Sequence, residues 1–144
     1  MKVKDILNSK GRTLFTVHED STVEHIVAEL AANKIGYLIV KGKDNTVTGV
    51  ISERDIVHRC MSAKKDPANV TAKEIMTERE KLVTANEDQE IDEVMTMMTQ
   101  KKVRHLPVFQ GNELTGLISI GDVIKIILDD KDEAIKTLMD YVSK

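Results

Sequence analysis

The chain has few of the residues that hold small proteins together covalently or through large aromatic side chains. Its 144 residues include one cysteine, no tryptophan, two phenylalanines and two tyrosines. The single cysteine, Cys60, excludes an intramolecular disulfide, and its neighbours do not show the spacing of metal ligands. Hydrophobic residues make up 41% of the sequence, so aliphatic side chains and methionine must fill the core.

Long apolar runs and clusters of one charge are also missing. No stretch approaches the ~20 apolar residues that a membrane span needs, and the N-terminal residues do not resemble a secretory signal. The formal net charge is -3, and charges of both signs are interspersed, so no basic stripe indicates nucleic-acid binding. We expect a cytoplasmic protein with no nucleic-acid partner and no membrane partner.

Catalytic and metal-binding patterns are absent from the sequence as well. Neither Cys60 nor any serine has a base at a recognised spacing, and His18, His25 and His58 form no triad or ligand pattern. The glycine-rich loops that bind phosphate in dinucleotide-binding and P-loop proteins do not occur. We therefore expect no catalytic residue, no metal site and no required cofactor, and predict that the protein is not an enzyme.

An internal repeat organises the chain. The segment Gly49–Val57, GVISERDIV, recurs 67 residues later as Gly116–Ile124, GLISIGDVI. Each copy predicts an apolar strand that enters a helix, with Ser-x-x-Asp where the strand ends. Because a repeat of this kind determines the fold, we divide the sequence into a first repeat, residues 1–67, and a second, residues 68–144.

Each repeat predicts a strand, a helix, two further strands and a second helix. In the first repeat the strands are expected at 13–17, 36–40 and 46–51, with counterparts at 81–85, 104–108 and 114–118. Ser21 begins a Ser-x-x-Glu pattern, which is typical of a capping box and predicts the start of the first helix. Pro107 predicts either a missing amide partner in its strand or a position at the sheet edge.

Additional helical segments flank these elements. Lys4–Leu7 and Lys73–Met76 match one another and predict a short lead-in turn before each repeat. Residues 132–142 predict an amphipathic helix whose apolar face must be buried somewhere. The apolar residues of that face are Ile135, Leu138, Met139 and Val142.

The two Ser-x-x-Asp turns leave two interpretations open. The serine and the acid can be a helix cap, since a hydroxyl accepts from free amides and a carboxylate favours the positive helix end. Alternatively, the free amides at the helix start can bind an anionic group, while the carboxylate accepts hydrogen bonds from a cis-diol. The second interpretation predicts a nucleotide at these turns.

The two repeated segments, together with the strand Arg104–Val108 (RHLPV), resemble the tandem cystathionine β-synthase (CBS) domain pair, or Bateman module. The resemblance covers essentially the whole chain and leaves no further domain. It implies an α/β (α+β) fold of two pseudo-twofold-related CBS repeats, each a small three-stranded sheet packed on two helices.

The resemblance also implies positions for a nucleotide. Asp55 and Asp122 correspond to the acid that holds the ribose, with Ser52 and Ser119 beside the ribose or phosphate. Adenine would lie between apolar strand residues and backbone groups. The adenine-pocket candidates are Ile51, Ile118, Tyr37, Gly36, Thr16 and Thr84.

Basic residues distinguish the repeats. When the repeats are aligned, Arg104 and His105 correspond to Gly36 and Tyr37, and Arg54 corresponds to Gly121. In CBS pairs, basic residues at this strand start approach phosphate, so we assign Arg104 and His105 to phosphate, with Arg54 as a second candidate. A solvent-exposed strand end with surface ion pairs is the alternative.

Phosphate-binding cations favour AMP, with ATP or NAD as further candidates, over S-adenosylmethionine, which carries no phosphate. The leading hypothesis is a regulatory module that binds adenine nucleotides in clefts between the repeats, forms a homodimer and signals through its shape or its affinity for a regulated protein partner. The alternative is a structural interaction module with degenerate clefts and no nucleotide role.

Overall fold

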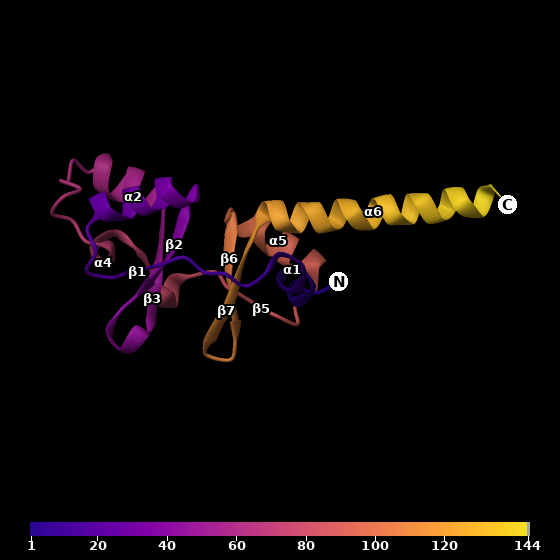
Figure 1. Cartoon of the computed structure of the whole chain (residues 1–144), viewed down its shortest axis with the longest axis horizontal. Coiled ribbons are helices and arrows are strands. Elements are labelled where there is room, and N and C mark those ends of the chain that lie inside the picture. The colour runs from indigo at the N-terminus through magenta and orange to yellow at the C-terminus, as the bar shows by residue number, and fades with distance from the viewer. Residues whose placement is uncertain (144) are drawn as a thin grey trace. The chain divides into compact units, whose positions relative to one another are not determined.

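The computed structural model describes residues 1–143, and they form two compact units of mixed α and β structure (Figure 1). One unit contains residues 13–82, and the other contains residues 1–12 together with the chain from Val83 on. The chain therefore passes between the units twice. These units do not coincide with the sequence repeats, whose boundary between residues 67 and 68 stays a prediction.

The unit of residues 13–82 is built on a four-stranded sheet in the order β1-β2-β3-β4. β1 (Thr16–His18) is parallel to β2 (Tyr37–Lys41), which pairs antiparallel with β3 (Val47–Ser52). β4 (Thr77–Glu78) adds antiparallel to β3. The three strands expected in the first repeat are present, and β4 is a fourth that follows the second lead-in turn.

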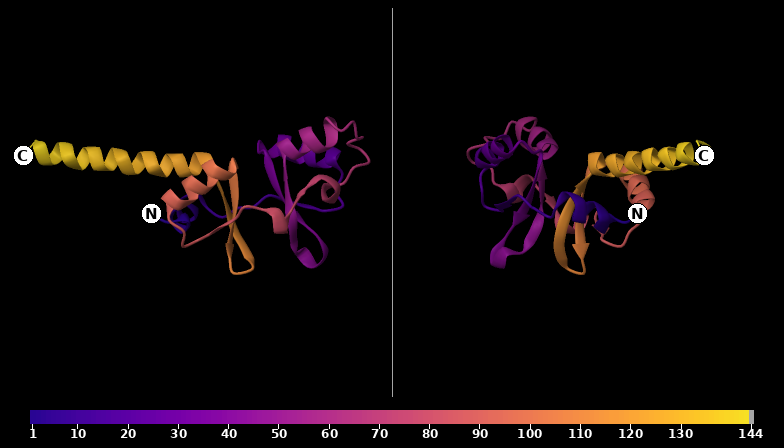
Figure 2. Two further views of the ribbon diagram at one scale, coloured as in Figure 1. Left: turned by 180° about the vertical axis from the view of Figure 1, so that it is seen from behind. Right: turned by 45° about the vertical axis from the view of Figure 1, so that its right-hand side comes forward.

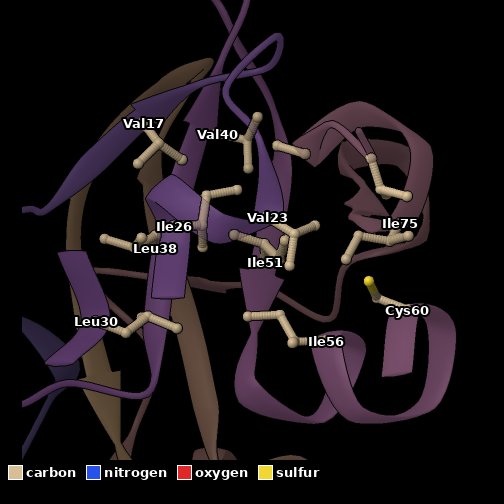
Figure 3. Close-up of a cluster of buried hydrophobic side chains, with 12 residues drawn as sticks. Val17, Val23, Ile26, Leu30, Leu38, Val40, Ile51, Ile56, Cys60 and Ile75 are labelled. Atoms are coloured by element: carbon tan, nitrogen blue, oxygen red, sulfur yellow. The ribbon is translucent and has the colours of Figure 1, made fainter. Parts of the chain in front are cut away.

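Helices cover this sheet and share one core with it. Figure 3 shows side chains of α2, the strands and the segment after β3 meeting in a single apolar cluster, with Cys60 Sγ directed toward Ile75. Cys60 is completely buried, as expected for a structural cysteine. The helical segments are α2 (Val23–Asn33), the turn η1 (Lys43–Asn45), α3 (Glu53–Asp55), the π-helical turn η2 (Ile56–Met61), α4 (Ala72–Ile75) and the turn η3 (Arg79–Lys81).

The cap of α2 differs from the sequence prediction. Thr22, not Ser21, is the N-cap residue, and its Oγ1 accepts a hydrogen bond of 3.2 Å from the His25 amide. Ser21 precedes the helix, where its carbonyl accepts from the Ala72 amide at 2.8 Å. The prediction was wrong because Ser21 is held by the α4 segment, so the helix begins one residue later.

The second unit is built on a three-stranded sheet in the order β5-β6-β7. β5 (Ala85–Asn86) is parallel to β6 (His105–Gln110), which pairs antiparallel with β7 (Glu113–Ser119). Three helices pack with this sheet around a second apolar core. They are α1 (Val3–Lys10), α5 (Ile91–Lys101) and α6 (Ile120–Val142).

Pro107 lies in β6, the central strand of its sheet, so the alternative of a position at the sheet edge is wrong. The other alternative, a missing amide partner, agrees with the pairing of β6 with β5. In the first sheet the equivalent residue, Ile39, donates its amide to the Phe15 carbonyl at 3.0 Å. Proline has no amide hydrogen to donate, and pairing of β6 with β5 begins at Val108. Pro107 thus explains why β5 starts one position later than β1.

The two lead-in segments are exchanged between the repeats. α1 lies at the start of the first repeat in sequence but packs on β7 of the second, where Leu7 faces Gly116. The equivalent segment, α4 with β4, packs in the other unit, where Met76 and Thr77 face Gly49. A Cβ on either glycine would lie too close to these atoms, so the glycine of each repeated segment makes room for a lead-in segment.

The C-terminal part of α6 extends beyond the other elements of its unit, as both views in Figure 2 show. Residues 128–143 are all exposed, and the apolar stripe expected for residues 132–142 faces solvent. Leu138 is 64% exposed and Val142 82% exposed. Within the described residues, no helix is long and apolar enough to cross a membrane.

Candidate functional site

Each Ser-x-x-Asp turn forms a reciprocal helix cap. Ser52 Oγ accepts from the Asp55 amide at 3.2 Å, and Asp55 Oδ2 accepts from the Ser52 amide at 3.0 Å. Ser119 and Asp122 do the same at 3.1 and 2.9 Å. The capping interpretation therefore describes real contacts in both repeats. Each serine keeps its hydroxyl hydrogen for another acceptor, because the cap uses only a lone pair of the serine oxygen.

The start of the middle strand lies beside each turn. In the first repeat the Glu53 amide donates to the Gly36 carbonyl at 3.0 Å, and in the second the Ile120 amide donates to the Arg104 carbonyl at 2.8 Å. Cross-strand pairing sets Tyr37 opposite Ser52. In the second unit it sets His105 opposite Ser119.

The Tyr37 phenol is buried close to the negative charge of Asp55. Burial of the phenol raises the pKa of Tyr37 well above its ordinary value, and the negative charge of Asp55 raises it further. The phenol therefore stays neutral and keeps its hydrogen at physiological pH. An adenine-pocket candidate and a ribose candidate are thus neighbours in one unit.

Two further side chains approach the Asp55 carboxylate. Thr77 Oγ1 lies 3.5 Å from Oδ1, and Arg59 Nε lies 3.8 Å from the same oxygen. Arg59 donates through Nη1 to the carbonyls of Ile75 and Met76 at 3.2 and 3.0 Å. The Arg59 guanidinium is therefore held mainly by backbone oxygens. The neutral hydroxyl of Thr77 lies nearer to the Asp55 carboxylate than Arg59 does.

Asp122 forms a much closer ion pair than the 3.8 Å pair between Arg59 and Asp55. Lys10 Nζ, at the end of α1, donates to Asp122 Oδ2 at 2.6 Å and to the Leu117 carbonyl at 3.0 Å. Burial of the Asp122 carboxyl raises its pKa, but the hydrogen bonds from Lys10 and Ser119 and the charge of Lys10 outweigh this effect. The pKa of Asp122 therefore lies below its usual value.

The remaining candidates occupy different surroundings. Ile51 and Ile118 are completely buried in the two cores, so any contact of theirs with a base would use the backbone. Thr16 and Thr84, on or just before the first strand of each sheet, are exposed. The charged candidates Arg54 and Arg104 are also exposed, while His105 is half-buried.

Lys10, Arg59 and Thr77 are side chains at these turns that the sequence analysis missed. Arg59 stands four residues after Asp55, a spacing that brings side chains together on a helix, so the pattern could have revealed it. Lys10 and Thr77 belong to the lead-in segments. Their contacts follow from the exchange of those segments, which periodicity within each repeat does not show.

A groove of about 490 Å³ lies between α5 and α6. None of the sequence-predicted site residues lines it. Its lining residues are Asp92, Met95, Thr96, Thr99, Gln100 and Ile127. Across residues 1–143, no group of three or more histidine, cysteine or acidic side chains is arranged to hold a metal ion.

The repeated turns, each at the end of a hairpin and the start of a helix, match a known domain. The CBS domain family model matches residues 3–62 and again residues 72–129. The chain belongs to the CBS domain family. The tandem CBS pair and its mixed α/β fold, expected from the repeated segments, are thereby confirmed.

Proteins similar to this CBS-domain chain include stand-alone CBS proteins. A CBS-domain containing protein from Agrobacterium tumefaciens is 34% identical, with a TM-score of 0.79, over 86% of this chain and 91% of that one. A CBS domain protein from Pyrobaculum aerophilum, solved in complex with AMP, is 26% identical, with a TM-score of 0.72, over 85% and 89%. The mitochondrial CBS domain-containing protein CBSX3 of Arabidopsis thaliana is 27% identical over 97% of this chain and 71% of its own length.

Proposed function

We propose that this CBS pair is a regulatory module that binds an adenine nucleotide at its two Ser-x-x-Asp turns. AMP is the favoured ligand, with ATP and NAD as further candidates. The observation that carries the proposal is that both turns keep a half-buried carboxylate and a serine hydroxyl at a helix start. The AMP complex of the related Pyrobaculum protein supports the choice of ligand.

The proposed roles follow from the chemistry of each group. Asp55 and Asp122 accept hydrogen bonds from the ribose diol, and Ser52 and Ser119 donate their remaining hydrogen to a ribose or phosphate oxygen. The exposed cations Arg104 and Arg54, together with His105, bind phosphate. Tyr37, Gly36, Thr16 and Thr84 border the base, with the backbone of Ile51 and Ile118.

Calorimetric titration with AMP tests the ribose assignment. Asp55→Ala and Asp122→Ala should each weaken one site by about 1–3 kcal/mol, roughly 5- to 150-fold, since each removes a charged hydrogen-bond acceptor. Glu74→Ala is a matched control because Glu74 Oε2 accepts from the Thr71 amide at 3.0 Å in another capping box. This control should lose a cap and keep AMP affinity.

Two results would contradict the proposal in different ways. Wild-type affinity in both aspartate variants would remove the ribose assignment. If the wild-type protein shows no heat and no thermal shift with AMP, ATP, NAD or S-adenosylmethionine, the chain is instead an interaction module with degenerate clefts. Arg104→Ala should weaken AMP but not adenosine, and equal losses for both would mean that Arg104 shapes the fold.

We also propose that the chain self-associates through α6, in keeping with the homodimer expected from sequence. Ile135, Leu138, Met139 and Val142 are between 54% and 82% exposed on the C-terminal part of this helix. An apolar stripe of this kind is stabilised when a second apolar surface covers it. A second copy of the chain provides a matching stripe.

A further inference from the structure

The two aspartates at the Ser-x-x-Asp turns are equivalent in sequence but differ in which carboxylate oxygens keep an acceptor position for a ligand. Asp122 Oδ2 accepts two hydrogen bonds, from the Ser119 amide at 2.9 Å and from Lys10 Nζ at 2.6 Å. Asp55 Oδ2 accepts the Ser52 amide at 3.0 Å. Asp55 Oδ1 accepts from Thr77 Oγ1 at 3.5 Å, so its two hydrogen bonds fall on different oxygens, whereas both bonds of Asp122 fall on Oδ2. The second of these comes from Lys10 on α1, a helix of the other repeat in sequence.

A ribose diol that binds a carboxylate through both hydroxyl groups needs a lone pair on each carboxylate oxygen. A carboxylate oxygen offers about two such positions. At Asp122 the backbone amide and Lys10 use both positions on Oδ2, which leaves the ligand only Oδ1. At Asp55 the amide uses one position on Oδ2 and the Thr77 hydroxyl one on Oδ1, so each oxygen keeps one position for a hydroxyl of the diol.

The groups near Asp55 do not reproduce the effect of Lys10. Arg59 Nε lies 3.8 Å from Asp55 Oδ1, which is beyond hydrogen-bond distance, and its Nη1 is held by two backbone carbonyls. Thr77 is a neutral hydroxyl at 3.5 Å and can rotate away from the carboxylate. Lys10 is additionally anchored by the Leu117 carbonyl at 3.0 Å.

We propose that Lys10 is a specificity-determining residue of the Asp122 turn, where it competes with the ribose diol for Oδ2. This inference rests on the proposed nucleotide binding. Lys10 makes the two turns unequal, because it occupies an acceptor position on Asp122 Oδ2 that stays open on Asp55 Oδ2. The Lys10 side chain is 39% exposed and that of Asp122 25% exposed, so the competing ion pair is of the modest strength typical near a surface.

Adenosine is the probe that isolates this effect, because it carries the diol without a phosphate. In an Asp55→Ala background, where Asp122 provides the remaining ribose carboxylate, Lys10→Met should tighten adenosine binding about two- to fivefold in a calorimetric titration. This range corresponds to removal of a surface ion pair. Lys10→Arg, which keeps a cation at this position, should show less than this gain.

Lys4→Met provides the matched control. Lys4 is also on α1 and also pairs with an acid, Asp88, at 3.5 Å, but it does not contact the Asp122 turn. It should leave adenosine affinity unchanged. Unfolding in urea, measured for every variant, confirms that the proteins compared are folded.

The outcomes separate the two proposals. If adenosine binding by the Asp55→Ala protein is unchanged or weaker after Lys10→Met, the competition is refuted, and weaker binding would make Lys10 a direct ligand of the nucleoside. If the wild-type protein binds neither adenosine nor AMP, the proposed function itself fails. A gain that persists when Asp122 is also changed to Ala would likewise overturn the role of Lys10 at this carboxylate.

Discussion

The contact between α1 and β7 can be tested by adding one methyl group to the glycine that permits it. A Cβ built on Gly116 would lie 2.6 Å from Leu7 Cδ2 and 2.8 Å from Cδ1. Leu7 is completely buried and so has little room to move. Gly116→Ala should therefore lower the free energy of unfolding by about 1–3 kcal/mol, the usual cost of an overpacked core.

A double-mutant cycle identifies Leu7 as the cause of this loss. Leu7→Ala alone should cost about 2–5 kcal/mol, because it leaves a cavity in the core. In the Leu7→Ala background the methyl group of Gly116→Ala occupies empty space. Gly116→Ala should then no longer lower the free energy of unfolding. The two substitutions should therefore be non-additive by about 1–3 kcal/mol.

Urea unfolding monitored by circular dichroism is the assay, with the midpoint and slope compared between variants. Gly121→Ala is the control in the same unit, since its nearest neighbour would be Ser119 Oγ at 3.6 Å. This control should be neutral or stabilising by up to about 1 kcal/mol, as alanine favours a helix. The placement of α1 on β7 is refuted if Gly116→Ala unfolds at the wild-type midpoint, or if its cost is the same with and without Leu7.

Three further predictions address the caps and the exposed helix. Because the pKa of Asp122 is lowered by folding, its carboxylate contributes stability above the unfolded pKa and loses it as pH falls through the folded pKa. The stability deficit of Asp122→Asn in urea should thus shrink between about pH 7 and pH 3, and a constant deficit would contradict this. Leu138→Asp should convert the proposed α6 dimer to a monomer in light scattering, whereas Thr137→Asp should not; a dimer in both would remove α6 as the interface. Thr22→Ala should cost about 1 kcal/mol in urea unfolding and Ser21→Ala less, and the reverse order would restore Ser21 as the cap.

The repeat made the fold predictable, because local patterns within each half agree with one another. The capping boxes at Ser52 and Ser119 follow directly from the Ser-x-x-Asp spacing. The hairpins follow from apolar runs separated by polar turns. The start of β5 could also have been derived, since Pro107 lacks the amide that Ile39 uses to pair with the preceding strand.

Long-range packing accounts for what the sequence did not predict. The sequence pattern of the lead-in segments does not indicate which repeat they pack against. Neither the Lys10 ion pair nor the fourth strand β4 could therefore be inferred. Ser21 and Thr22 are both good caps, and a backbone bond from the α4 segment decides between them. Ile51 follows the apolar strand pattern, which does not say whether a side chain faces the core or a ligand.

The exchange of lead-in segments also determines which unit is formed by one continuous segment of the chain. Residues 13–82 supply every strand and helix of one unit from an uninterrupted piece of chain. A fragment cut at the repeat boundary, residues 1–67, would carry α1 without the β7 surface beneath it and would lack β4 at the edge of its sheet. Truncations, fusions and circular permutations of this chain should therefore be designed with junctions near Thr13 and Leu82.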